Sequence, residues 1–220
     1  MQRRGKRHLS AVMSLGAAVV VMVVVAGCSS GSKSSSASTT TSASGPTTVA
    51  DPNAVPPVTA TATTDALKAL LVDPGAGFTA LPESGGGAGP VDLARAAQDS
   101  PSGEPGPLTQ AGFLGGYQGR WQHTDGRQLL VSVYEFGDPS GPTQMLSASQ
   151  SNPGFQASPH FAVGTIPGAQ GTLTTGAGVA SVAFATGPYL VDILAFASPD
   201  AAAQALATQT AEGQYAKLGR

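Results

Sequence analysis

The chain has 220 residues, with 11 Lys and Arg against 13 Asp and Glu, and charged residues make up only 11% of it. This composition excludes a basic nucleic-acid-binding protein, because no positive excess is present to neutralise phosphates, and a single cysteine excludes a disulfide-stabilised scaffold. The totals combine three unlike segments: a basic and apolar N-terminus, a Ser/Thr-rich stretch, and a remainder that holds all the aromatic residues.

The first segment, residues 1–27, has the organisation of an export signal. Basic residues near its start are followed by an uncharged apolar run of 17 residues, Ala11 to Gly27, that ends in small residues. A membrane-spanning helix needs roughly 20 residues, so a cleaved leader is favoured over a permanent transmembrane helix. Ordinary secretion is favoured over twin-arginine export, because no apolar pair follows Arg3 and Arg4.

The end of this leader carries a lipidation signal. Its last residues, Val25-Ala26-Gly27-Cys28, resemble the lipobox of bacterial lipoproteins, although Val25 stands where Leu is commoner. The resemblance implies cleavage between Gly27 and Cys28 and a diacylglycerol group on the Cys28 thiol. Two acyl chains hold a protein stably on a bilayer, whereas one chain dissociates. We therefore expect a lipid-anchored protein on the outer face of the cell membrane.

The second segment, residues 28–63, is predicted to be a disordered tether. From Ser29 to Thr63 the chain is rich in Ser, Thr and Pro, contains no aromatic residue, and carries only Lys33 and Asp51 as charged residues. Such a composition cannot bury a core. A flexible chain of these 35 residues has an r.m.s. span of about 30 to 35 Å. The tether would hold the folded part away from the membrane.

The third segment, residues 64–220, is predicted to form a single domain. Its first part is rich in Gly and Pro, with short helices predicted over Asp65–Leu71 and Val91–Gln98 and a strand over Phe78–Leu81. A chain of about this length buries roughly 70% of the surface that it exposes when unfolded. It can therefore support a hydrophobic core of its own.

The middle of the domain predicts a β-hairpin followed by a helix. Two alternating runs, Gly116–His123 and Gln128–Phe136, flank Asp125-Gly126, which is a strong signal for a two-residue loop. A helix is then predicted from about Pro139 to Ser149, with Asp138 as its cap.

The expected register of this hairpin defines a candidate binding surface. It places Tyr117 opposite Tyr134 and Trp121 opposite Leu130, so that one face is aromatic, while Arg120 and neighbouring amides offer donors on the other face. The alternative is that the aromatic side chains simply fill the core. The residues named as the candidate binding site are Tyr117, Arg120, Trp121 and Tyr134.

The last third predicts a second hairpin and a closing helix. Gly178–Ala185 and Pro188–Ala197 alternate about Thr186-Gly187, and a helix capped by Ser198 is predicted to run to about Lys217. One side of that helix is small and mostly apolar, as expected for packing on a sheet. This stripe consists of Ala203, Leu206, Ala207 and Thr210.

These elements predict an α+β domain, a twisted antiparallel sheet of hairpins backed by helices and closed by a C-terminal helix. The element order, with stretches such as Val131–Phe136 and Ala183–Ile193, resembles the small PsbP-like domains of actinobacterial lipoproteins. That resemblance implies a sheet crossed by a C-terminal helix, and it implies no shared chemistry.

The sequence offers few catalytic or metal-binding groups. Ser181 and Asp192 are expected opposite each other, with His160 on a neighbouring strand, but nucleophiles usually lie at exposed turns, so a cross-strand hydrogen bond is the favoured interpretation. Glu135 and Asp138 are too few to hold Ca²⁺. We therefore assign no catalytic residue, no metal and no cofactor, and expect no enzymatic activity.

The function that these observations favour is a noncatalytic binding or accessory module at the cell envelope. Its partner would be an envelope protein or an amphipathic small molecule, and not a nucleic acid. Two alternatives stay open: an envelope hydrolase that uses Ser181, Asp192 and His160, and a surface spacer without a specific ligand.

Overall fold

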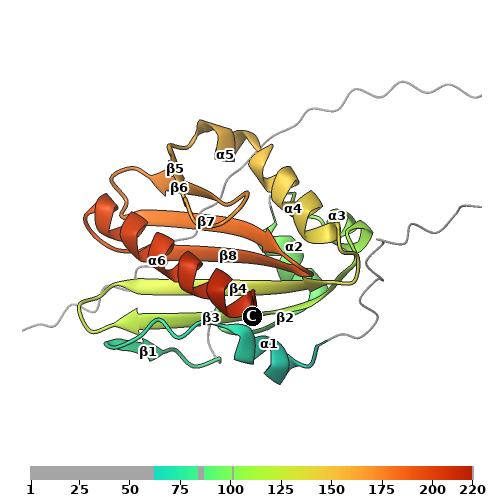
Figure 1. Ribbon diagram of the computed structural model, residues 1–220, viewed down its shortest axis with the longest axis horizontal. Coiled ribbons are helices and arrows are strands. Elements are labelled where there is room, and N and C mark those ends of the chain that lie inside the picture. Colours follow the sequence, from blue (N-terminus) through green and yellow to red (C-terminus); the bar gives the residue numbers. More distant parts are fainter. Residues whose placement is uncertain (1–61, 84–86, 101, 220) are drawn as a thin grey trace, which may run out of the picture. The chain divides into compact units, whose positions relative to one another are not determined.

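In the part of the chain that the structure describes, eight strands form one antiparallel sheet, and helices cover parts of both faces (Figure 1). The computed structural model describes residues 62–83, 87–100 and 102–219. The strands are β1 (Phe78–Ala80), β2 (Gly89–Val91), β3 (Phe113–His123), β4 (Gln128–Phe136), β5 (His160–Ala162), β6 (Gln170–Thr174), β7 (Val179–Thr186) and β8 (Tyr189–Phe196). The helices are α1 (Thr64–Leu70), α2 (Leu93–Asp99), α3 (Pro105–Gln110), α4 (Gly141–Gln150), α5 (Pro153–Ala157) and α6 (Asp200–Leu218).

The sheet has the strand order β1-β3-β4-β8-β7-β6-β5, and β2 pairs with β3 next to β1. The two hairpins β3-β4 and β7-β8 lie side by side at its centre, joined by the pairing of β4 with β8. The α+β fold with a C-terminal helix is confirmed. Helices α1, α2 and α4 lie within a few residues of their predicted positions, whereas α3, α5 and β2 were not predicted.

The folded part begins two residues before the predicted boundary. The backbone N–H of Ala62 donates to Oε2 of Glu135 at 2.8 Å, and the hydroxyl of Thr63 caps α1 by accepting from the N–H of Ala66. Glu135 is 3% exposed, so this hydrogen bond ties the start of the domain to the interior. The leader, the Gly27 and Cys28 site, and residues 29–61 of the tether lie outside the described residues.

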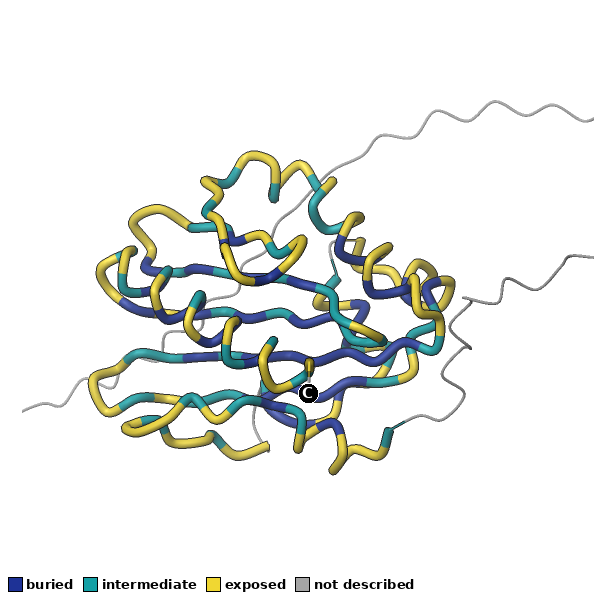
Figure 2. Tube along the Cα trace, in the orientation of Figure 1, coloured by how far each residue is buried: buried dark blue, intermediate teal, exposed yellow. Residues whose placement is uncertain are grey.

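The main core lies between the sheet and helices α1 and α6. Buried residues run along the central strands, while the helices expose their outer sides (Figure 2). The α6 stripe predicted from the sequence is confirmed, because its alanines are fully buried and let the helix approach the sheet closely. The most deeply buried side chains of this core include Leu129, Val131, Val133, Val182, Phe184, Val191 and Ile193.

A buried amide fastens α1 to α6 on this face. Gln214 is 0% exposed, its Oε1 accepts from the N–H of Val72 at 2.7 Å, and its Nε2 donates to the carbonyl of Leu70 at 2.8 Å. Leu70 is the last residue of α1, and its carbonyl lacks a helical partner, while Val72 follows the C-cap residue Leu71. The Gln214 side chain of α6 therefore supplies hydrogen-bond partners to backbone groups at the C-terminal end of α1.

A second, smaller core lies on the opposite face, at one end of the sheet under α2, α3 and α4. It includes Val91, Leu108, Tyr134, Phe136, Met145 and Leu190. The described residues belong to one compact unit, and both cores are built from them. A chain that starts at residue 50 retains both cores and so meets the condition for independent folding.

The loop of the first hairpin is one residue longer than predicted. The N–H of His123 donates to the carbonyl of Arg127 at 2.8 Å, and the N–H of Gly126 donates to the carbonyl of His123 at 3.0 Å. The loop therefore consists of residues 124–126, with Gly126 at φ +94°. A three-residue loop that ends in a residue with positive φ is a common hairpin connection, and Gly adopts that conformation without strain.

This longer loop shifts the register by one residue and corrects the predicted faces. Tyr117 lies opposite Val133, and Trp121 lies opposite Leu129. A shift by one residue moves side chains to the other face of a strand. The prediction that Tyr134 shares a face with Tyr117 and Trp121 is therefore wrong. Tyr134 lies on the opposite face of the sheet.

The second hairpin is also shifted, but without a change of face. Thr186 pairs with Tyr189, so the loop is Gly187-Pro188 rather than Thr186-Gly187. Phe184 lies opposite Val191 and not, as predicted, opposite Tyr189. The register differs by two residues from the predicted one, and an even shift keeps every side chain on its expected face.

The start of α6 differs from the prediction in its cap. The helix begins at Asp200 with Pro199 as N-cap residue, and Ser198 does not cap it. The carboxylate of Asp200 instead accepts from the N–H groups of Gly176 and Gly178, at 2.7 and 2.9 Å. It thereby joins α6 to the turn between β6 and β7.

Candidate functional site

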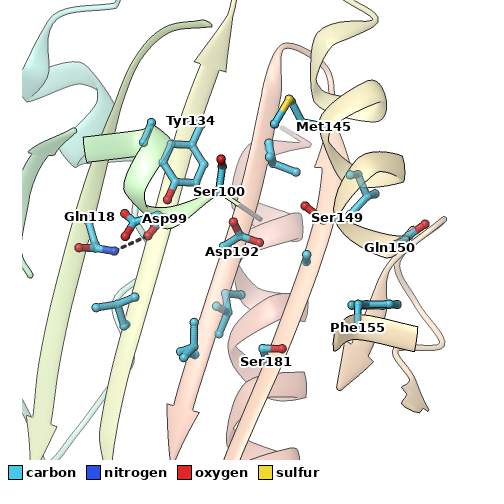
Figure 3. Close-up of a pocket in the computed structure, with 18 of the residues that line it drawn as sticks. Asp99, Ser100, Gln118, Tyr134, Met145, Ser149, Gln150, Phe155, Ser181 and Asp192 are labelled. Carbon is cyan, nitrogen blue, oxygen red and sulfur yellow. Dashed lines mark hydrogen bonds between the residues drawn. The ribbon is translucent and has the colours of Figure 1, made fainter. Parts of the chain in front are cut away.

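The face of the sheet opposite α6 carries a cavity of about 310 Å³ (Figure 3). Its floor is formed by β3, β4, β8, β7 and β6, and its sides come from α2, α4 and α5. Cavities that bind small molecules start at about this volume and combine apolar walls with a few polar groups. The position follows from the fold, because α2 and α4 pack only on one end of this face and leave its middle uncovered.

The walls of the cavity are largely apolar. Leucines of β4 and β8 line the floor, Met145 and Leu146 come from α4, and Phe155 comes from α5. The apolar lining includes Leu130, Leu190, Leu194, Met145, Leu146 and Phe155. These side chains can bury the apolar body of a ligand.

Polar groups gather in the floor around Asp192. Asp192 lies on β8 between Ser132 of β4 and Ala183 of β7, which are its cross-strand neighbours. Ser181 and Tyr134 also line the cavity from β7 and β4. Figure 3 shows Asp192 between Tyr134 and Asp99 on one side and the α4 side chains on the other.

Burial raises the pKa of the Asp192 carboxyl to about 6, and the nearby carboxyl of Asp99 adds to that shift. Among residues 62–83, 87–100 and 102–219, no group donates a hydrogen bond to the Asp192 side chain. Asp192 is half-buried, and a carboxylate that is largely removed from bulk water usually accepts several hydrogen bonds. Asp192 therefore presents acceptor atoms to the cavity that its described neighbours do not use. Burial also raises the pKa of Asp99.

A chain of hydrogen bonds from Arg95 through Gln118 to Ser132 stabilises one edge of the floor. Gln118 is 6% exposed, and its Nε2 donates to the hydroxyl of Ser132 at 2.8 Å. Its Oε1 accepts from the guanidinium of Arg95, which also donates to the carbonyl of Pro90 at 3.2 Å. Arg95 of α2 thereby fixes the orientation of Gln118 and, through it, the position of Ser132 next to Asp192.

The structure separates the four residues predicted as a binding surface. Tyr117 and Trp121 belong to the core beneath α1 and α6, which agrees with the alternative that they fill the interior. Tyr134 lines the cavity. Arg120, opposite Leu130, shares the face of Tyr134, and its Nη2 donates to Oε1 of Gln128 at 2.8 Å, but it does not line the cavity.

The residues of the hydrolase alternative share a face but do not form a triad. Ser181 lies opposite Leu194 rather than Asp192, and its hydroxyl is hydrogen-bonded at 2.6 Å to that of Thr172. His160 pairs with Thr172, so it lies two strands from Ser181, with about 10 Å between their backbones. Its exposed ring packs on Phe155, with 4.7 Å between centroids. The predicted cross-strand pair of Ser181 and Asp192 is therefore wrong.

The described residues show neither a metal cluster nor a helix fit to cross a bilayer. No group of three or more His, Cys, Asp or Glu is arranged there to hold a metal ion. Glu135 accepts from Ala62, and Asp138 accepts from the N–H and hydroxyl of Ser140, both at 2.8 Å. None of the helices from α1 to α6 combines the length and apolar character that a transmembrane span needs.

Comparisons with known proteins found no matching family model, no matching curated protein and no matching solved structure. The resemblances to lipoproteins and to PsbP-like domains therefore stay predictions.

Several residues of the cavity were missed by the sequence reasoning. Asp99, Met145, Leu146 and Phe155 come from three short helices, two of which lie in Gly- and Pro-rich sequence. A single signal was available in the sequence: Asp192 is a charged residue in the middle of a strongly apolar strand.

Proposed function

We propose that the domain is a noncatalytic binding module whose cavity takes a small amphipathic molecule. The observation that carries this proposal is the cavity itself, with apolar walls on three helices and polar groups clustered around Asp192. Cys28 and the tether would present the module at the outer face of the cell membrane. An apolar pocket with few polar groups favours binding over the spacer alternative.

A substitution that fills the cavity tests this proposal. Ser149 lines the cavity from α4, whereas Ser147 of the same helix is exposed and does not. We expect residues 50–220 to bind the uncharged fluorescent probe N-phenyl-1-naphthylamine at one saturable site, and Ser149→Phe to weaken that binding at least about tenfold, because its ring occupies the cavity. The measurement is a fluorescence titration.

Ser147→Phe is the matched control and should leave the affinity unchanged. Circular dichroism of both variants checks that they fold. Equal affinities of the two variants, or the lack of saturable binding to the unsubstituted chain, would contradict the proposal.

The proposed membrane anchor has its own test. We expect the full-length chain, expressed in a bacterium, to lose residues 1–27 and to gain a diacylglycerol group on Cys28, because the thioether and two acyl chains give stable anchoring. Mass spectrometry of detergent-extracted protein measures both changes. Cys28→Ser should keep its leader and gain no lipid. An intact leader with an unmodified Cys28 in the unsubstituted protein would rule out the anchor.

A further inference from the structure

We infer that the ligand of the cavity is a cationic amphipathic molecule, with an ammonium group held by Asp192 and an apolar body held by the walls. The inference rests on the proposed binding function and adds to it the charge of the ligand.

The charges around the cavity have one sign. The charged side chains that line it are Asp99 and Asp192, and no described basic residue lines it. Arg95, whose guanidinium contacts the lining residue Gln118, also donates to the carbonyl of Pro90. Its charge lowers the pKa of Asp99 against the larger effect of burial. Among the described residues, no basic side chain forms an ion pair with Asp192, so its negative charge in the floor stays available to a ligand.

The geometry around Asp192 suits an ammonium group. Such a group has three N–H donors and no acceptor, and the described residues give the Asp192 carboxylate no donor. The hydroxyl oxygen of Ser132, directly opposite Asp192 on β4, lines the same floor and can accept one of the remaining protons. A charge-assisted hydrogen bond in a cavity of low polarity is about twice as strong as a neutral one.

The apolar lining requires the rest of the ligand to be apolar. Leu190 and Leu194 lie two residues on either side of Asp192 on β8, and Leu130, Met145 and Phe155 line the same cavity. A free metal ion would leave these side chains without a partner, and two carboxylates are few for a cation that takes six to eight oxygen ligands. An anionic ligand would be repelled by Asp99 and Asp192.

A displacement series of six-carbon probes tests the sign of the charge. Hexylammonium, hexan-1-ol and hexanoate have the same chain and differ in their head group. At pH 7.5 we expect hexylammonium to displace N-phenyl-1-naphthylamine from residues 50–220 at a concentration at least about tenfold lower than hexan-1-ol, with hexanoate the weakest. Asp192→Asn should remove the advantage of hexylammonium and leave hexan-1-ol unchanged.

Asp138→Asn is the matched control, because it removes an exposed carboxylate from outside the cavity. It should leave all three probes unchanged. Lowering the pH to 5 should also weaken hexylammonium, as Asp192 becomes protonated; the other titratable or charged groups beside it are Asp99, Tyr134 and Arg95.

The outcomes separate this inference from the function on which it rests. Equal displacement by hexylammonium and hexan-1-ol, or a loss of both in Asp192→Asn with the fold intact, would overturn the cationic ligand while the probe still binds. Failure of N-phenyl-1-naphthylamine to bind the unsubstituted chain would overturn the cavity as a binding site.

Discussion

Replacing Phe184 by alanine is expected to destabilise the domain by about 3 to 5 kcal/mol, the usual cost of deleting a fully buried aromatic side chain. Phe184 is 0% exposed and lies between the sheet and α6. Its ring meets that of Tyr215 edge to face, with 5.8 Å between centroids. The substitution removes this contact and leaves a cavity that the surrounding β-sheet cannot close. Chemical denaturation measures the change in the free energy of unfolding.

Phe196→Ala is the matched control on the neighbouring strand. Phe196 is 37% exposed, so we expect its loss to cost less than about 1 kcal/mol. Similar losses for the two substitutions would mean that α6 does not cover the sheet as described.

Asp192→Asn is expected to change stability in a pH-dependent way. The carboxyl has a pKa of about 6 in the folded domain, against about 3.9 in an unfolded chain. The folded state therefore binds the proton more tightly, and stability falls as the pH rises from about 4 to about 6. The full cost, up to about 3 kcal/mol, is present above pH 6. Asparagine removes that cost, so the variant should gain stability relative to the unsubstituted chain between pH 4 and pH 7.

The measurement is the difference in unfolding free energy between the two proteins at several pH values. Asp138→Asn provides a control of opposite sign, because hydrogen bonds from Ser140 lower the pKa of Asp138, and its contribution is lost as the pH falls. A pH-independent difference for Asp192→Asn would show that its carboxyl is not desolvated. Such a cost at neutral pH is consistent with a residue retained for binding rather than for stability.

Much of the fold could be predicted from the sequence, because both hairpins and α6 have strong local signals. The alternating runs of β3 and β4, the turn glycines, and the small stripe of α6 each specify one local structure. These signals are independent of distant parts of the chain. The short elements α3, α5 and β2 carry no comparable pattern, and contacts with the rest of the domain decide their conformation.

Register was the least predictable feature. Asp125-Gly126 fits both a two-residue and a three-residue loop. The two loops differ by one residue in register, and they therefore place Tyr134 on opposite faces of the sheet. In the second hairpin the predicted register was wrong by two residues. Because an even shift does not change the face of a side chain, Ser181 and Asp192 lie on one face, as predicted. A local turn motif therefore predicts that a hairpin exists more securely than it predicts which side chains share a face.

The site itself could be predicted only in part. Tyr134 was predicted as part of the binding surface, whereas Ser181 and Asp192 were considered as members of a hydrolase site, and all three line the cavity. Their common cavity depends on where α2, α4 and α5 pack, which no local pattern specifies. The unpaired acid within the apolar strand β8 was the residue whose chemistry most needed an explanation.

The most direct test of the proposed binding site uses Met145, which is the only methionine in residues 50–220 and lines the cavity. With methionine labelled at its methyl carbon, the domain should give a single methyl resonance. We expect N-phenyl-1-naphthylamine to shift that resonance saturably through the ring current of the bound probe. In Ser149→Phe the titration should need at least about tenfold more probe to reach half of its maximal shift. A Met145 methyl resonance that stays in place while the probe binds would contradict a ligand in this cavity.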